Sequence, residues 1–355
     1  MTAPRRTISV SIAAVLLLTT AACTGSSHKS KSASPAVPIS PSPSASPSKP
    51  PHRPAAPARN PFTGIGGVPK TPTVIVKIDD TAPGRPQVGI DLADIVYVEA
   101  VEGGLTRLAA VFGTYKPGKV GYVRSTRPSD PDLFLQYGKI TEAYSGGAHD
   151  SLPRVHRSGI RSWSNDAGAA FYYRSPHPGD HGYINLVLNV KKVARHTHTP
   201  RPRPIGWTFS RTVTGIRMTR GTHVQTAVTG SYRSGTAVNF RWIPRLHKYV
   251  RYIGGVAQRA ADGHYVAATN VIVQACRVVA HPADRDVLGN PAQFTYTVGR
   301  GPVSVFRNGR RINGVWTRRH LSTGTVLRSA TGKQIPLMPG NTWVILIRKG
   351  VPVFG

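Results

Sequence analysis

The sequence predicts an α/β or α+β domain over residues 61–200 and a second, mostly β domain over residues 201–355, both after a disordered tether. In the first region, short β-branched apolar runs alternate with helix-start signals and Gly-Gly pairs, a pattern typical of α/β domains. In the second region, runs rich in Val, Thr, Tyr and Phe are separated by Gly-containing turns, which favours strands. The acidic residues divide the chain in the same way, because twelve of the fifteen Asp and Glu lie between Asp79 and Asp180.

Residues 1–22 have the pattern of a lipoprotein signal peptide. Arg5 and Arg6 form a positive n-region, and residues 8–18 form an apolar stretch too short to span a membrane comfortably. Small residues then lead into Cys23 as in a bacterial lipobox, so we expect Cys23 to be diacylated and to become the mature N-terminus. A plain secretory signal is the alternative. Lipidation would hold the chain at the extracytoplasmic face of the cell membrane.

Residues 23–60 are expected to form the disordered tether. The segment consists mainly of Ser, Pro and Ala with scattered basic residues, and it has no acidic and no aromatic residue. Such a composition cannot bury enough apolar surface to offset the entropy lost on ordering. Fully extended, at about 3.1 Å per residue, the tether would span about 100 Å.

A β-hairpin is predicted around Gly103 and Gly104. Residues 94–101 and 105–114 are apolar runs on either side of this pair, and a two-residue Gly-Gly loop favours a tight turn. In that register Glu102 and Arg107 would lie on the same face as diagonal neighbours, with Glu99 on the other face.

Strands and two short helices complete the first region. Helix caps are predicted at Asp130, before a helix body at residues 133–137, and at Asp150, before a helix through Val155. The strands predicted in addition to the hairpin are residues 73–79, 121–125 and 140–145.

The second region begins after the basic, Pro-rich run at residues 195–204, which fits a surface connection. Cys276 lies in an apolar run and is expected to be a buried, unreactive thiol. Trp316 and Trp343 are expected in the core. The strands predicted here are residues 222–228, 238–243, 271–279, 294–298, 303–307, 310–316 and 343–347.

Several strings resemble the YerB-like family of bacterial lipoproteins. They are NPFTGIGGVP, VKIDDTAPGRPQVGIDLADIVYVEAVEGGLTRLAAVF, KVGYVRSTRP and the Gly-Gly pair after ITEAYS in the first region, and VSVFRNGRRINGVW and GKQIPLMPGNTWVILI in the second. The resemblance covers most of the chain beyond residue 60. It implies an anchored extracytoplasmic protein with an N-terminal domain of unknown function and its own C-terminal domain, and it implies no activity.

Polar residues gather where the predicted strands end, and ligands of α/β sheets bind at the carboxyl ends of strands. Arginines at strand ends suit capture of a carboxylate or phosphate, and a Gly-Gly turn that opens a helix offers backbone N–H groups to the same anion. The alternative is that the arginines neutralise neighbouring acids in structural ion pairs. The candidate ligand-binding residues are Asp79, Asp80, Arg85, Glu99, Glu102, Arg107, Arg124, Ser125, Arg127, Gly147 and His149.

The sequence lacks the usual catalytic and metal-binding motifs. It contains no GxSxG, no HExxH and no spaced Cys/His set, so we expect no cofactor and no metal, and favour a binding or scaffolding protein over an enzyme. Carboxylates do occur in pairs at Asp79/Asp80 and Glu99/Glu102. A hydrolase acting on envelope glycan or polymer through the cluster from Asp79 to His149 is therefore the alternative.

The chain is strongly basic, with a formal net charge of +31. From residue 181 onward, 26 Lys and Arg stand against 3 acidic residues. Nucleic acid is not expected as a partner because of the signal sequence. Anionic wall polymers, anionic lipid headgroups or envelope proteins are the candidate partners, and genome composition is an alternative source of the charge.

The lipid anchor can be tested by changing Cys23→Ala. We expect this variant to leave the membrane fraction and enter the medium, because the chain would have no residue to acylate. Cys276→Ala is the matched control and should stay with the membrane. Retention of the Cys23→Ala protein in the membrane fraction would contradict the lipobox interpretation.

Overall fold

The computed structural model describes residues 59–176, 184–229 and 237–355. The signal peptide, Cys23 and nearly all of the tether lie outside the described residues. Their assignments therefore stay predictions.

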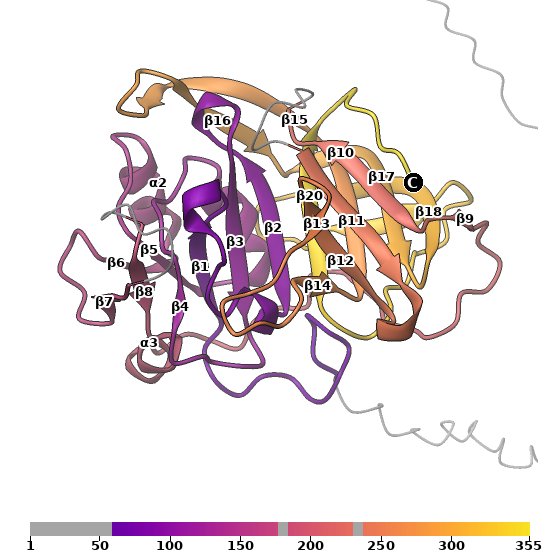
Figure 1. Cartoon of the computed structure of the whole chain (residues 1–355), viewed down its shortest axis with the longest axis horizontal. Helices are drawn as coiled ribbons and strands as arrows, with labels where there is room; N and C mark the ends of the chain where they lie inside the picture. Colours follow the sequence, from indigo (N-terminus) through magenta and orange to yellow (C-terminus); the bar gives the residue numbers. More distant parts are fainter. Residues whose placement is uncertain (1–58, 177–183, 230–236) are drawn as a thin grey trace, which may run out of the picture. The chain divides into compact units, whose positions relative to one another are not determined.

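Twelve strands of the described chain form one sheet (Figure 1). They are β1 (Val74–Asp79), β2 (Ile95–Ala100), β3 (Thr106–Phe112), β5 (Thr141–Tyr144), β6 (Arg161–Ser164), β9 (Thr219–Arg220), β15 (Asn270–Arg285), β16 (Pro291–Tyr296), β17 (Gly299–Arg307), β18 (Arg310–Arg318), β19 (Val326–Ser329) and β20 (Thr342–Arg348). The order across the sheet is β19-β18-β17-β15-β20-β2-β3-β1-β5-β6, with β16 beside β15 and β9 beside β18.

Strand β20 joins the two regions of the sequence into this sheet. It pairs in parallel with β15 on one side and with β2 on the other, and Trp343 lies opposite Val271 and Val96 in the two registers. All six residues of β2 are buried, as expected for a strand covered on both faces. The segments predicted as two domains therefore share one continuous sheet.

A second sheet packs against one face of the large sheet, as Figure 1 shows for β10 to β12. Phe240 contacts Trp343 edge to face with ring centroids 5.4 Å apart, and Tyr249 contacts Phe306 at 6.4 Å. Its strands are β10 (His223–Ala227), β11 (Ala237–Ile243), β12 (Lys248–Ile253), β13 (Val256–Ala257) and β14 (Ala267–Ala268). A third, small sheet contains β4 (Val120–Gly121), β7 (Tyr172–Arg174) and β8 (Leu186–Leu188).

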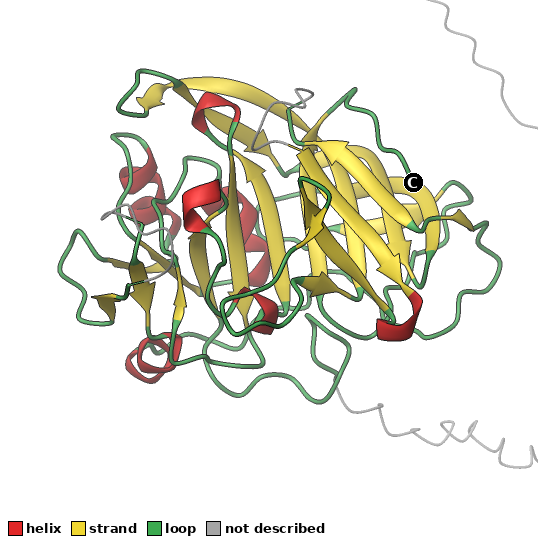
Figure 2. Ribbon diagram, in the orientation of Figure 1, coloured by secondary structure: helices red, strands yellow, loops and turns green. Residues whose placement is uncertain are grey.

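The protein is mostly β in both regions, and an α/β first region is not supported (Figure 2). The α-helices of the described residues are short, with five residues in α1 (Asp130–Phe134), eight in α2 (Ser151–Ser158) and seven in α3 (Val190–His196). Both helices occur where they were predicted, but the N-cap of α1 is Ser129 and not Asp130, and neither N-cap side chain forms a capping hydrogen bond. Neither helix is long enough to form a helical layer over a sheet. The predicted strand at residues 121–125 shrinks to β4.

The second region agrees with its predicted strands. Each of the seven predicted runs overlaps a strand, and Trp316 and Trp343 are each 1% exposed. Cys276 is fully buried in β15, and burial raises the pKa of its thiol to about 12. The predicted unreactive thiol fits this environment, because the thiolate is the reactive form.

The predicted hairpin register is wrong because the turn differs from the one predicted. Residues Glu102–Gly104 form a 3-10 turn, in which Gly103 and Gly104 have positive φ, rather than a two-residue loop. As a result Glu99, and not Glu102, lies directly opposite Arg107 in the β2–β3 pair. Cross-strand partners share a face, so Glu99 and Arg107 lie on the same face of the sheet.

A buried ion pair links the second sheet to the end of β1. Asp80 accepts hydrogen bonds from both terminal nitrogens of Arg251 on β12, each at 2.8 Å, and one at 2.7 Å from the Thr106 hydroxyl. Burial alone would raise the pKa of Asp80, but the Arg251 guanidinium, together with Arg85 and the Thr106 hydroxyl, holds that pKa below its usual value. Arg251 also lies over the ring of Trp343, 5.2 Å from its centroid.

We expect Arg251→Ala to lower the free energy of unfolding by about 3–5 kcal/mol, because it leaves the buried Asp80 carboxylate without its main partner. Arg241→Ala is the matched control. Arg241 lies on neighbouring β11, is exposed and lies over the ring of Tyr252, so its loss should cost about 1 kcal/mol or less. Urea denaturation of the two variants measures the difference, and equal losses would contradict a stabilising role for the pair.

Candidate functional site

Buried charged side chains cover one face of the sheet at β1, β2 and β3. Asp79, Arg107 and Glu99 are cross-strand neighbours on this face. Lys77 precedes Asp79 by two residues and therefore points the same way. The Lys77 ammonium is fully buried and donates hydrogen bonds to Glu99 Oε2 and Asp130 Oδ1, each at 2.9 Å. Asp130 comes from α1, which covers this face.

Glu142 on β5 extends this set, and we call Lys77, Glu99, Asp130 and Glu142 the buried charge layer. The Thr126 hydroxyl lies 2.7 Å from Glu142 Oε1 and 3.0 Å from Asp130 Oδ2. Burial and then the nearby Asp130 raise the pKa of Glu142 to about 8, and they raise the pKa of Glu99 well above its usual value. Burial would raise the pKa of Asp130 too, but the Lys77 ammonium holds it below its usual value. The raised pKa values favour the protonated forms of Glu99 and Glu142 in this layer.

Asp79 lies beyond this layer, where β1 ends. Its Oδ1 accepts hydrogen bonds from the amide and the hydroxyl of Thr81, both at 2.6 Å. Its Oδ2 lies 3.3 Å from Nε of Arg124, whose side chain is one-third exposed. A Cβ at Gly84 would lie 2.7 Å from the Asp79 side chain, so a glycine is required there for the chain to pass so closely.

Arg107 is surrounded by other charged groups but lacks hydrogen-bond partners at two nitrogens. It is 4% exposed, and within the described chain its Nε and Nη1 are buried without a partner. Burial, followed by the charge of Arg127, lowers the pKa of Arg107 to about 9, which Asp79 partly opposes. Arg127 itself is held by Glu102, whose Oε2 accepts from its Nε at 3.0 Å and from its Nη2 at 2.6 Å.

Asp80 and Arg85 do not belong to this cluster. Successive strand residues point to opposite faces, so Asp80 lies on the far side of the sheet from Asp79, with Arg251. Arg85 follows it, with its Nε 3.9 Å from Asp80 Oδ1. The structure therefore brings together Asp79, Glu99, Glu102, Arg107, Arg124 and Arg127, and it separates Asp80 and Arg85 from them.

Ser125, Gly147 and His149 lie on the segments next to the cluster. Ser125 Oγ is 3.4 Å from Ser145 Oγ, at the end of β5. Gly147 packs against Leu152 and Thr126, where a Cβ would come within 3.0 Å of both. His149 is exposed just before α2.

The N–H groups at the start of α2 are already occupied, which the sequence did not suggest. Asp284 of β15 accepts from the amides of Asp150 and Ser151, at 2.5 and 3.0 Å. Nearby, His281 lies 2.8 Å from the Asp150 carboxylate. A side chain of the protein thus fills the position predicted for an external anion.

Sequence reasoning missed four of the residues that organise this region: Lys77, Asp130 as a partner of Lys77, Glu142 and Arg251. Lys77 had a usable signal, because a lysine in the middle of an otherwise apolar strand requires buried partners. Arg251 had none, since it is 171 residues from Asp80 along the chain.

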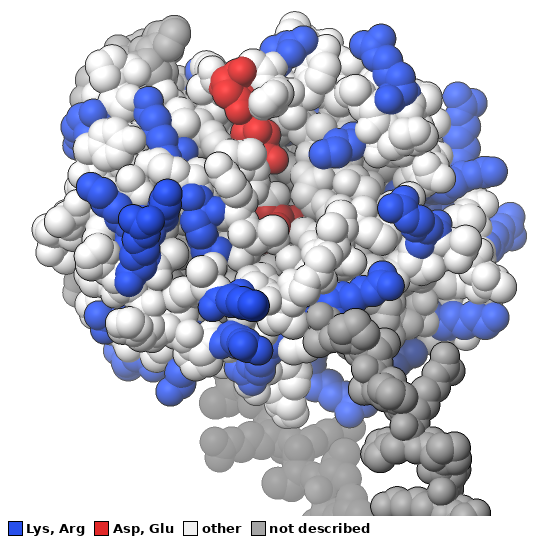
Figure 3. Space-filling view, turned by 90° about the horizontal axis from the view of Figure 1, so that it is seen from below, with Lys and Arg blue, Asp and Glu red and all other residues white. Residues whose placement is uncertain are grey.

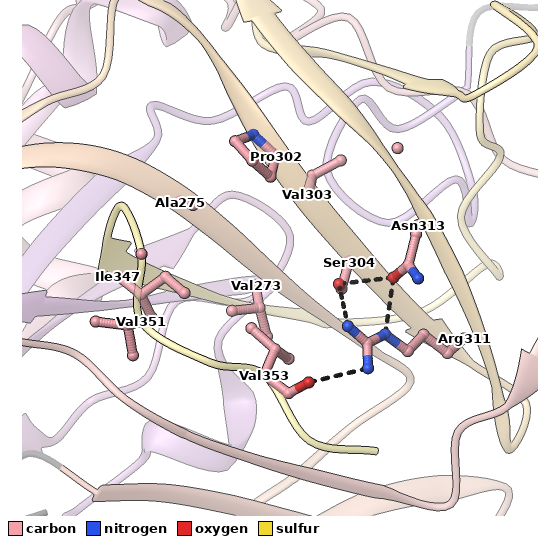
Figure 4. Close-up of a pocket in the computed structure, with 12 residues that line it drawn as sticks. Val273, Ala275, Pro302, Val303, Ser304, Arg311, Asn313, Ile347, Val351 and Val353 are labelled. Atoms are coloured by element: carbon pink, nitrogen blue, oxygen red, sulfur yellow. Dashed lines mark hydrogen bonds between the residues drawn. The ribbon is translucent and has the colours of Figure 1, made fainter. Parts of the chain in front are cut away.

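Cavities are found elsewhere, on the second region. The one shown in Figure 4 has a volume of about 350 Å³, and its apolar walls include Val273, Val303 and Ile347. Arg311 forms its polar end and donates to Ser304 and to the Val353 carbonyl, both at 3.0 Å. Because these polar groups form hydrogen bonds with one another, they do not indicate a ligand in this cavity.

The charge of the surface is uneven. On the face viewed in Figure 3, Lys and Arg are spread widely, and the visible acidic side chains form one short line near the centre.

None of the helices in the described chain has the length and apolar character needed to cross a bilayer.

Comparison with protein families gives two matches along the chain. Residues 62–201 match a model described as "Protein of unknown function (DUF3048) N-terminal domain". Residues 227–344 match the corresponding "C-terminal domain" model. Neither description names a reaction or a ligand.

Comparison with single proteins gives the same result. The chain is 25% identical over 295 residues to the "Putative lipoprotein YerB" of Bacillus subtilis, covering 77% of this chain and 80% of that protein. It also resembles the crystal structure of YerB from Bacillus subtilis, with a TM-score of 0.68 and 21% identity, covering 84% of this chain and all of that one. The structural likeness supports the fold.

The raised pKa of Glu142 predicts a pH dependence of stability. Because the folded state binds a proton more tightly than the unfolded state, this group lowers the free energy of unfolding as the pH rises from about 4.5 through 8. We expect Glu142→Gln, which stays neutral, to flatten that fall. Urea denaturation at pH 5, 6.5 and 8 measures it, with Asp166→Asn, an exposed acid, as control. Parallel pH curves for Glu142→Gln and the unchanged protein would contradict the assignment.

Proposed function

The chain belongs to the DUF3048 family of two-domain proteins of unknown function, and from this premise we propose that it is a lipid-anchored cell-envelope protein that binds an anionic ligand. The anchor rests on Cys23 and on the lipoprotein name of the Bacillus subtilis relative. The ligand is a phosphate- or carboxylate-bearing group of the envelope, such as a wall polymer or a protein partner.

The proposal rests on Arg107, whose guanidinium is buried and has two nitrogens without a partner among the described residues. A buried guanidinium with two unpartnered N–H groups is costly, and such groups are normally paired in a folded protein. An anion reaching it would supply the missing acceptors through charge-assisted hydrogen bonds, which are stronger than neutral ones.

The surrounding charges favour the same ligand. The guanidinium groups of Arg107, Arg124 and Arg127 lie beside the carboxylates of Asp79 and Glu102, and the third acid of the cluster, Glu99, has a raised pKa that favours its neutral form. Arg127 is engaged by Glu102, whereas Arg124 is one-third exposed and only 3.3 Å from Asp79. Arg124 is therefore the residue through which a ligand would approach, with the hydroxyls of Ser125 and Ser145 beside it.

The hydrolase alternative has less support. Glu99 and Glu142, whose pKa values are raised as an acid catalyst requires, are fully buried in the charge layer. Asp79 and Asp80 point to opposite faces of the sheet and cannot act on one bond together. Glu102 is bound by Arg127.

Arg124→Ala tests the proposed site with the full chain. Inorganic phosphate and a poly(glycerol phosphate) chain are the probes, titrated by calorimetry at constant salt. We expect affinity for both to fall about tenfold or more, since a hydrogen bond to a charged group contributes about 1.5–3 kcal/mol. The melting temperature should change little, because Asp79 keeps its two bonds from Thr81.

Arg157→Ala, which removes an exposed arginine of α2, is the matched control for net charge. Arg127 is left unchanged because its loss would leave the Glu102 carboxylate without its partner. Equal affinities for the Arg124 and Arg157 variants would mean that binding follows overall charge, and the proposed site would be rejected.

A further inference from the structure

Two acidic side chains and a histidine converge on a different part of the molecule, away from Arg107. Asp91 lies in a 3-10 turn of the first region, at Ile90–Leu92, and Asp262 and His264 lie on a turn of the second region. One ligand atom from each of the three falls within 4.8 Å of the others. His264 Nδ1 is 3.0 Å from Asp262 Oδ2 and 3.7 Å from Asp91 Oδ2.

Asp91 shows that this cluster is electrostatically incomplete. Its side chain is only 9% exposed, and its Oδ1 is buried without a hydrogen-bond partner among the described residues. A nearly buried carboxylate that faces a second carboxylate lacks the cation that would normally accompany it.

The nearby cations do not fill this role. Lys248 is close enough for its charge to act on Asp91, but within the described chain no ion pair of 4 Å or less joins them. The His264 ring is 76% exposed and already beside Asp262. The buried Oδ1 of Asp91 therefore remains unpaired.

The backbone holds the three side chains in place from both regions. The amide of Ala261 donates to the carbonyl of Gln87 at 2.9 Å, and the Gln258 amide group donates to the Gln87 side chain at 2.9 Å. The amide of His264 donates to Asp262 Oδ1 at 3.0 Å, which leaves Oδ2 of Asp262 directed at the imidazole. Neither side of the cluster is a free loop.

We propose that Asp91, Asp262 and His264 bind a divalent transition-metal ion, with zinc as the best match. One imidazole nitrogen and two carboxylate oxygens are borderline ligands that suit Zn²⁺, whereas Ca²⁺ prefers sites made of oxygen alone. Water would complete the tetrahedral shell, because two of the three residues are exposed. The ion links a turn after β1 to a turn after β13, and its role is to fasten the second sheet to the first region.

This site is independent of the anion site and survives if that proposal fails. The test uses the full chain, freed of metal by chelator and then titrated with ZnCl₂, with CaCl₂ and MgCl₂ in parallel. We expect one zinc site per chain and a rise in melting temperature with zinc, since binding to the folded state alone stabilises it. Calcium and magnesium should have weaker effects.

The variants are His264→Ala and Asp262→Asn, which change exposed side chains and should not impair folding. We expect each to lower zinc affinity at least tenfold and to abolish the thermal shift. His198→Ala is the control, because it removes an exposed histidine outside the cluster. Zinc affinity and thermal shift that are the same in His264→Ala and His198→Ala would overturn the proposal, as would a larger response to calcium than to zinc.

Discussion

Strand β20 forms hydrogen-bonded ladders with β15 on one side and with β2 on the other, so a strand from the end of the chain completes the sheet that β1 begins. The contacts between the second sheet and the first region lie beside this strand. The second sheet can pack over Trp343 and Phe306 because β20 and β17 bring them to one face. Arg251 can then reach Asp80, and Asp284 can reach the start of α2.

The two faces of β1 have different chemistry, and this separates the candidate residues. On one face, Asp80 is fully satisfied by Arg251 and Thr106 and serves the contact between sheets. On the other, one buried lysine forms ion pairs with Glu99 and Asp130, and burial raises the pKa values of Glu99 and Glu142. The interpretation of the arginines as structural partners of acids fits Arg127, which is paired with Glu102. It leaves Arg107 unexplained, which is why a ligand is proposed there.

Local patterns predicted most strands and the starts of both N-terminal helices, because β-branched runs and capping residues act over a few positions. Both helices were also predicted to be short, but their ends differ from the prediction, since α1 ends at Phe134 and not at residue 137, and α2 continues past Val155 to Ser158. The site was predictable as a cluster of strand-end charges but not in its pairing. Glu99, and not Glu102, is the cross-strand neighbour of Arg107, because the turn at Gly103 and Gly104 is longer than two residues. Arg251 comes from a distant strand that no local signal connects to Asp80.

The position of β20 also affects the order in which the protein can be completed. The ribosome synthesises β2 near residue 95 and β20 only near residue 342. During most of synthesis, the edge of β2 that pairs with β20 is therefore uncovered. Its sequence, Ile95–Ala100, is mostly apolar with Glu99 as its one acidic residue, and an apolar strand with an open edge can pair with other chains. A segment that ends before residue 342 would keep that edge permanently. Pairing with the last strand thus covers the edge through which an isolated first region could pair with another chain.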